Sequence, residues 1–209
     1  MGVVPARPCA SALLLFVLLS PLASFLGLPL SLVESGVTIG SSETRGVRRV
    51  ATVGVYGFTI DGFFEALREA DVRLLLDVRQ RRGVRGAQYA WANAVRLQAA
   101  LARAGIEYRH HRELAPTTDL RRLQYREDAR LGVGKRSRVV LAPEYRRRYV
   151  AEILDRVDLG PIVETMPPKG RAAFFCVERD PEACHRSLIA ERLAARYPVV
   201  VTHLRPSPG

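Results

Sequence analysis

The chain has 209 residues, of which 48% are hydrophobic and 25% are charged, values ordinary for one globular domain with an appendage. It carries 32 Lys and Arg residues against 21 Asp and Glu residues, so its formal net charge is +11. Three cysteines, Cys9, Cys176 and Cys184, without a four-ligand spacing, argue against a disulfide scaffold and against a structural zinc site. The two cysteines near the C-terminus are expected to be reduced thiols.

The excess of basic residues is almost entirely arginine, since Lys135 and Lys169 are the only lysines. Guanidinium groups bind phosphate bidentately, so the charge favours an anionic partner, either a nucleic acid or a phosphorylated small molecule. A solvated basic surface without such a partner is the competing interpretation.

An apolar segment occupies residues 10–33, within a region 1–46 that precedes the expected domain. The run is long enough for a transmembrane anchor, although Pro21 and Pro29 would kink such a helix. A signal peptide and a start codon assigned too far upstream remain as alternatives. The domain itself is expected to be cytoplasmic, and the alternative is a protein anchored in the membrane through residues 10–33.

Strand and helix patterns alternate from residue 47 to residue 205, followed by a short tail, 206–209. Apolar runs predict five strands, at 50–56, 72–77, 106–109, 172–177 and 199–202. Helical spacing predicts helices from about 61 to 70, 92 to 104, within 115–142, from 144 to 157, and from 181 to 197. The alternation predicts a single α/β domain with a mainly parallel sheet and helices on both faces.

Polar residues follow several of these strands, at the edge of a parallel sheet where ligands usually bind. Asp77 and Arg79 follow the second strand, and Glu178 follows the fourth. Tyr56 and Arg109 end the first and third strands, which makes them candidates for substrate binding. Asp77 and Glu178 are candidates for acid–base catalysis, with a structural role of Asp77 as an equal alternative.

Arg186 opens the apolar stripe of the last helix, so its side chain is expected to point inward toward the strand ends. A buried arginine needs a partner, and Asp77 or Glu178 is the expected one, or else a bound anion. We therefore predict that Arg186 and Arg79 bind the substrate.

Cys184 is expected in the first turn of that helix, where the helix dipole, His185 and Arg186 favour a thiolate and hence a catalytic nucleophile. His185 is a further candidate catalytic residue. Small buried packing is the alternative for this cysteine. Cys176, Cys184 and His185 also contain metal-ligand atoms, but adjacent ligands are awkward and a fourth is missing, so neither a metal nor a cofactor is expected.

The chain resembles the domain-of-unknown-function 488 family in three separate motifs. These are VATVGVYGFTIDGFFEALREADVRLLLDVR, GIEYRHHRELAPT and FFCVERDPEACHRSLIAERL, which together span roughly residues 48–205. The resemblance implies an α/β fold with a shared polar site at Asp77, Arg79, Glu178, Cys184, His185 and Arg186, but no reaction.

These observations favour an enzyme that acts on a phosphorylated or nucleic-acid-related substrate through Cys184. The alternatives are a non-catalytic module that binds nucleic acid through the arginine-rich stretches, and a membrane-tethered interaction protein. The substrate and the oligomeric state do not follow from the sequence.

Overall fold

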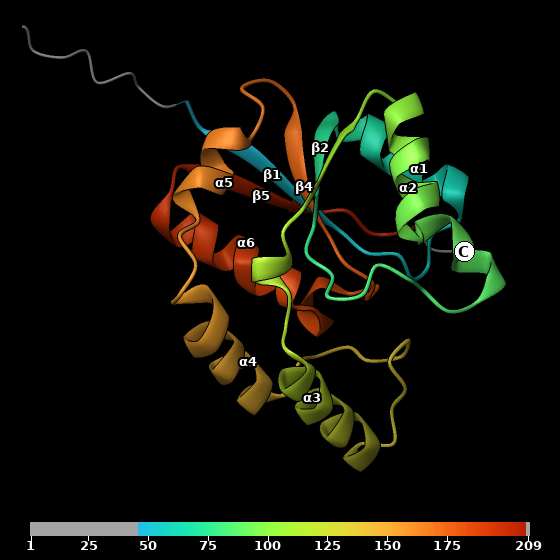
Figure 1. The fold of residues 1–209 in the computed structure, drawn as a ribbon, viewed down its shortest axis with the longest axis vertical. Coiled ribbons are helices and arrows are strands. Elements are labelled where there is room, and N and C mark those ends of the chain that lie inside the picture. The colour runs from blue at the N-terminus through green and yellow to red at the C-terminus, as the bar shows by residue number, and fades with distance from the viewer. Residues whose placement is uncertain (1–45, 208–209) are drawn as a thin grey trace, which may run out of the picture. The chain divides into compact units, whose positions relative to one another are not determined.

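The computed structural model describes residues 46–207, which form a five-stranded sheet flanked by helices (Figure 1). Every pair of neighbouring strands is parallel, and the order is β3-β2-β4-β1-β5. The strands are β1 (Arg48–Val53), β2 (Val72–Asp77), β3 (Glu107–His110), β4 (Arg171–Phe175) and β5 (Val199–His203). The prediction of an α/β fold with a parallel sheet is confirmed.

Six α-helices connect the strands in this part of the chain: α1 (Ile60–Glu69), α2 (Ala94–Arg103), α3 (Thr118–Arg130), α4 (Pro143–Tyr149), α5 (Gly160–Thr165) and α6 (His185–Arg196). Three short 3₁₀ turns lie at Ala87–Ala92, Arg112–Leu114 and Pro181–Ala183, and a π-helical turn, Val150–Leu154, follows α4 directly.

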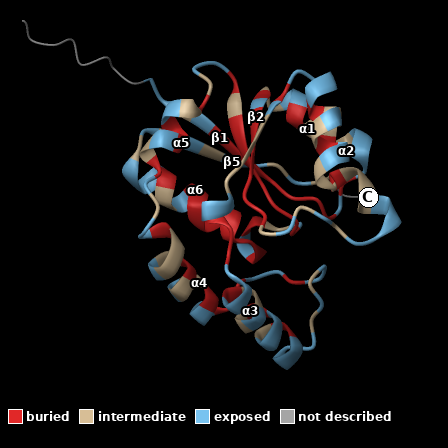
Figure 2. Ribbon diagram, viewed as in Figure 1, coloured by how far each residue is buried: buried red, intermediate tan, exposed pale blue. Residues whose placement is uncertain are grey.

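The central strands β2 and β4 are buried on both faces, which explains their continuous apolar sequences. Leu75, Leu76, Phe174 and Phe175 have no exposed surface. In Figure 2 the buried residues concentrate in the strands, whereas the helices expose their outer sides. The edge strands β3 and β5 are only partly covered.

Helix α1 shows how local signals and packing agree. Thr59 caps it by accepting a hydrogen bond from the amide of Gly62 at 3.1 Å. Phe63 and Leu67, one turn apart, are buried against the sheet, and the ring of Phe63 packs edge-on against Phe175.

The connections define where a ligand site can form. From β1 and β2 the chain moves toward the β3 edge, through α1 and α2 (Figure 1). From β4 it moves toward the β5 edge, through α6. Right-handed crossovers then place these two sets of helices on opposite faces. The loops after the neighbouring strands β2 and β4 diverge, and such a switch point leaves a crevice beyond the strand ends.

One sequence-based prediction about the helices was wrong, and one helix was not predicted. The last helix begins at His185 instead of Pro181, because Cys184 adopts an extended conformation (φ −140°, ψ 141°) between the 3₁₀ turn and α6. Asp180 precedes the 3₁₀ turn instead of the helix, and its side chain accepts no capping hydrogen bond there. The short helix α5 was not predicted, since six residues are too few for a clear helical period.

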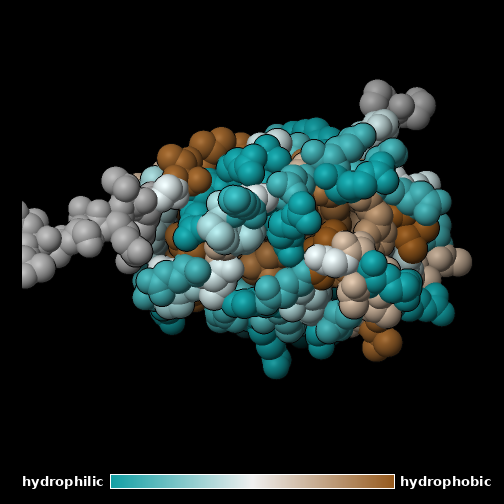
Figure 3. All heavy atoms as spheres, turned by 90° about the horizontal axis from the view of Figure 1, so that it is seen from above, coloured by the Kyte–Doolittle hydropathy of each residue, from teal (hydrophilic) through white to brown (hydrophobic). Residues whose placement is uncertain are grey.

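On the face shown in Figure 3, hydrophilic residues cover most of the area and hydrophobic residues lie in separate groups. Residues 10–33 lie outside the described part of the chain. Among residues 46–207, no helix has the length and apolar character needed to cross a membrane.

Candidate functional site

A cavity of about 510 Å³ lies at the crevice between the loops that follow β2 and β4. One wall comes from the β2 loop, Arg79 to Arg85, and the floor comes from Cys176 to Glu178 and Ala183 to His185. Side chains of α3, α4 and the loop between them cover the opposite side, namely Arg121, Gln124, Tyr125, Lys135, Arg138, Leu141 and Tyr145. The long connection from β3 to β4 thus covers one side of the site.

A buried polar network holds this cover in place. Arg138 donates from Nε to Asp128 at 2.9 Å, and its Nη2 donates to the same carboxylate. Gln124 donates to Asp128 at 2.9 Å and accepts from the amide of Ala142 at 2.8 Å. The network fixes α3 to the start of α4, so the 131–142 loop has a defined path over the cavity.

Basic side chains dominate the cavity wall. Arg79, Arg81, Arg85, Arg121, Lys135 and Arg138 line it, whereas Glu178 is the single carboxylate among the described lining residues. Arg81 and Arg85 have no hydrogen-bond or ion-pair partner for their guanidinium groups within residues 46–207, and Arg121 donates to neutral partners, the side chains of Gln80 and Tyr125. None of these three guanidinium groups is paired with a carboxylate, so each retains a positive charge that can bind an anion.

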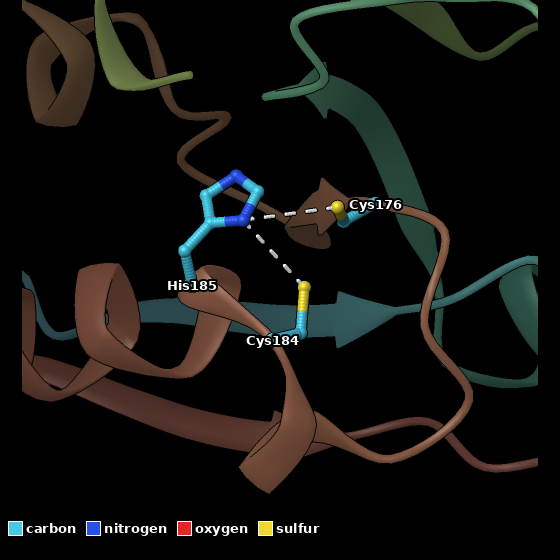
Figure 4. Close-up of side chains that lie close together, drawn as sticks. All are labelled: Cys176, Cys184 and His185. Atoms are coloured by element: carbon cyan, nitrogen blue, oxygen red, sulfur yellow. Dashed lines mark hydrogen bonds between the residues drawn. The ribbon is translucent and has the colours of Figure 1, made fainter. Parts of the chain in front are cut away.

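The floor brings together the two cysteines, Glu178 and His185. Oε2 of Glu178 lies 3.2 Å from Sγ of Cys176 and 3.2 Å from Sγ of Cys184. Nδ1 of His185 lies 3.9 Å and 3.8 Å from the same two sulfur atoms, and Figure 4 shows this nitrogen directed toward both. Each of these four residues exposes less than one-tenth of its surface to solvent, and all four line the cavity.

The two thiols differ in acidity. Burial raises the pKa of Cys176 well above its ordinary value, and its contacts with Cys184 and Glu178 raise it further. Burial also raises the pKa of Cys184, but the hydrogen bond with Cys176 and the charges of Arg186 and His185 outweigh it and leave that pKa well below its usual value. Cys184 is therefore the sulfur that loses its proton first.

The pKa of His185 rises above its usual value. Burial alone would lower it, but the neighbouring Cys184, Glu178 and the backbone carbonyl of Val78 favour the charged ring. Glu178 is in turn placed near two cations, with Oε1 3.8 Å from Nζ of Lys135 and 3.6 Å from Nη1 of Arg138.

Asp77 and Arg79 pair with each other below the wall of the cavity. Nε and Nη2 of Arg79 donate to the two carboxylate oxygens at 2.8 and 2.7 Å, and Nη1 donates to the carbonyl of Ala92 at 2.8 Å. The hydroxyl of Tyr108 donates to Asp77 at 2.7 Å. Arg79 lines the cavity with its charge already balanced, and Asp77 is not among the lining residues.

The expected partners of Arg186 were wrong. The side chain is fully buried, as expected, but its guanidinium donates to the backbone carbonyls of Glu178 at 2.7 Å and Arg179 at 2.9 Å. A loop of five residues between β4 and the 3₁₀ turn leaves these carbonyls without ladder partners, so Arg186 supplies the donors. It does not line the cavity.

The remaining predicted residues separate into two groups. Tyr56 lines the cavity, next to Arg136, whose guanidinium lies 5.5 Å from the ring centroid of Tyr56. Arg109 lies on β3, pairs with Glu107 at 2.7 Å and is not part of the lining.

Sequence reasoning missed the residues that cover the site. Lys135 and Arg138 lie in a loop that carries no motif, and Gln124 and Asp128 lie in a helix of polar composition. The spacing of Gln124 and Asp128, four residues apart on one face of α3, was the available signal.

The fold and the site define an α/β protein with a basic cavity over a thiol–imidazole–carboxylate cluster, at the switch point of a parallel sheet. The chain matches the family model described as domain of unknown function DUF488 over residues 59–193, and it belongs to this family. The match includes the β2 and β4 loops and the first nine residues of α6. The search of curated proteins gave no match. The search of solved structures gave none either.

Proposed function

We propose that the protein is an enzyme that binds a phosphorylated or nucleic-acid-derived anion in the basic cavity and transforms it at the cavity floor. The observation that carries this proposal is the joint lining of one cavity by unpaired guanidinium groups and by the Cys184–Glu178–His185 cluster. A cavity with these guanidinium groups but without the Cys184–Glu178–His185 cluster would favour a simple anion-binding module.

The anion is held by Arg81, Arg85 and Arg121, because these side chains have no carboxylate partner to lose when they bind it. Lys135 adds a further charge, partly balanced by Glu178. The planar guanidinium forks suit the paired oxygens of a phosphate group.

The floor supplies the reacting groups. Cys184 is the nucleophilic centre, and Glu178, which contacts its sulfur, is the proton acceptor. His185 fixes the position of the sulfur from the other side. Side chains of α3 and α4 cover the cavity on the side opposite the floor.

Calorimetric titration with pyrophosphate at low salt tests the binding half of the proposal. Replacing Arg81 and Arg85 with Gln should weaken binding by about tenfold or more for each lost charged hydrogen bond. The matched control replaces Arg96 and Arg103, two exposed arginines of α2 outside the cavity, and removes the same charge. It should keep the affinity within about twofold, since only screened long-range attraction is lost.

The rival function, a nucleic-acid-binding module, predicts a different result. In that case pyrophosphate fails to bind, a single-stranded oligonucleotide binds with an affinity that falls steeply with salt, and the two double variants weaken it equally. That combination would overturn the enzyme proposal.

A further inference from the structure

We propose that Cys176, Cys184 and His185 form a binding site for one thiophilic divalent metal ion, for which zinc is the best fit. As a binding site the proposal stands on the geometry of the three side chains. What the ion does there rests on the proposed function, because the site lies on the floor of the basic cavity.

The three ligand atoms already converge. The two Sγ atoms and Nδ1 of His185 all lie within 4.8 Å of one another, and the sulfur–nitrogen separations are 3.8 and 3.9 Å. Tetrahedral zinc, with bonds of about 2.3 Å to sulfur and about 2.0–2.1 Å to nitrogen, requires separations of about 3.6 Å between S and N and about 3.8 Å between two S atoms. The sulfur–nitrogen separations therefore need to shorten by only a few tenths of an ångström. The two sulfurs lie within 4.8 Å of each other, so they reach tetrahedral separation by closing by at most about 1 Å.

From the sequence, Cys184 and His185 are expected to bind one metal ion poorly because they are adjacent in the chain. The backbone conformation removes this difficulty. Cys184 is extended and lies just before α6, whereas His185 is the first residue of the helix. This change of backbone conformation turns the two neighbouring side chains toward the same point, opposite Cys176 from the end of β4.

The tautomer of His185 is fixed in the form that a metal ion needs. Nε2 lies 3.0 Å from the carbonyl oxygen of Val78, which can only accept, so Nε2 carries the proton. The lone pair of Nδ1 in the neutral ring then faces the two sulfurs. A ligating histidine held by a backbone carbonyl through its second nitrogen is the usual arrangement in metal sites.

Glu178 provides the route for the protons that must leave. When the ion binds, two sulfur–metal bonds and one nitrogen–metal bond form and two protons leave, one from the thiol of Cys176 and one held by Cys184 or by Nδ1 of His185. Protons on the sulfurs can pass to water by way of Glu178 Oε2, which contacts both sulfurs. The ion and the two thiolates then sum to zero charge. Glu178 keeps its own partners, Lys135 and Arg138.

Three protein ligands leave one position of a tetrahedral ion open, as in catalytic zinc sites. Because all three residues line the cavity, a water molecule or an oxygen atom of the bound anion can take this position. In this refinement of the proposed function, Cys184 acts through the ion, and Glu178 lies beside it as the base for the ion's water.

Cobalt(II) titration of the metal-free, fully reduced full-length chain tests the site without any substrate. We expect one equivalent to bind with a near-ultraviolet thiolate-to-cobalt charge-transfer band and the intense visible bands of a tetrahedral ion, and we expect zinc to displace it. Cys176→Ser and Cys184→Ser should each reduce the charge-transfer band. Each should also weaken cobalt affinity by more than the about 10–100-fold that is typical when a residue hydrogen-bonded to a metal ligand is lost. Cys9→Ser, which removes the third cysteine, should leave both unchanged.

The absence of a charge-transfer band in the wild-type chain would overturn the proposal, and so would a band that persists when Cys176 and Cys184 are both replaced. Pyrophosphate titration of the same samples separates the two hypotheses. If the wild-type chain gives no cobalt charge-transfer band but still binds pyrophosphate, the metal site is rejected and the proposed function is not. If the Arg81→Gln/Arg85→Gln variant loses pyrophosphate binding but still binds cobalt, the metal site does not depend on the anion-binding arginines.

Discussion

Arg79 and Asp77, two residues apart at the end of β2, form an ion pair with virtually no exposed surface on either side chain. Five hydrogen bonds satisfy the two groups, including those to Ala92 and from Tyr108 and the amide of Arg79. The pair directs the chain from the sheet into the basic loop that forms one wall of the cavity. Its role is to shape that loop, because both charges are already balanced.

Removal of one partner of this pair should destabilise the fold strongly. Arg79→Met or Asp77→Asn leaves a buried charge without its partner, and we expect a loss of about 3–5 kcal/mol in the free energy of unfolding, measured by urea denaturation. The chain offers a matched control in Arg73 and Asp71, which have the same spacing and a 2.7 Å contact but are exposed. Arg73→Met should cost no more than about 1 kcal/mol. Equal losses at the two pairs would contradict this account.

The hydroxyl groups of two stacked tyrosines should differ in their effect on stability. Tyr149 donates to the carbonyl of Leu114 at 2.6 Å in the core, so Tyr149→Phe leaves that carbonyl unsatisfied and should cost about 1–3 kcal/mol. Tyr145 lines the cavity and makes no hydrogen bond through its hydroxyl within the described residues. Tyr145→Phe should be nearly neutral in thermal unfolding, and a larger cost for it than for Tyr149→Phe would count against the assigned geometry.

Gly54, directly after β1, allows the loop that carries Glu178 to approach closely. A Cβ atom at this position would lie 1.9 Å from the carbonyl oxygen of Glu178, a backbone atom that cannot move without displacing the cavity floor. Gly54→Ala should lower the unfolding temperature and also reduce cobalt and pyrophosphate binding. Gly46→Ala, where no atom lies within 4 Å, is the control and should change neither property. Wild-type binding by Gly54→Ala would show that the floor does not depend on this contact.

Glu178 lowers the positive potential of the cavity, because it is the single carboxylate among the described lining residues. Glu178→Gln should therefore tighten pyrophosphate binding and increase its dependence on salt, while any catalytic turnover falls because the proton acceptor is lost. Glu113→Gln, on the exposed 3₁₀ turn outside the lining, removes the same charge and serves as the comparison in calorimetry. Weaker pyrophosphate binding by Glu178→Gln would be inconsistent with the proposed orientation of the anion.

The sequence predicts those parts of this fold that local physics determines. The apolar runs at 72–77 and 172–177 identify the buried strands because both faces of the central sheet are covered. The polar residues after them converge because parallel strands end at one edge. Cys184, Glu178 and His185 were therefore accessible to sequence reasoning, together with the burial of Arg186.

Contacts between segments that are distant in the sequence could not be predicted in this way. Arg186 was expected to meet a carboxylate, but the loop after β4 presents its carbonyls to the guanidinium, and no periodic pattern encodes that loop path. The cover formed by Gln124, Asp128 and Arg138 depends on a network between α3 and the following loop. The convergence of Cys184 and His185 required the extended backbone at Cys184, which the helical pattern obscured.

The most direct test of the central claim, that the basic cavity leads an anion to the thiol cluster, is protection of Cys184 from alkylation. The metal-free full-length chain is treated with iodoacetamide with and without saturating pyrophosphate, and mass spectrometry follows Cys184, Cys176 and Cys9 separately. We predict that pyrophosphate slows the modification of Cys184, that Arg81→Gln/Arg85→Gln removes this protection, and that Cys9 is unaffected. An alkylation rate of Cys184 that is the same with and without pyrophosphate would contradict the account.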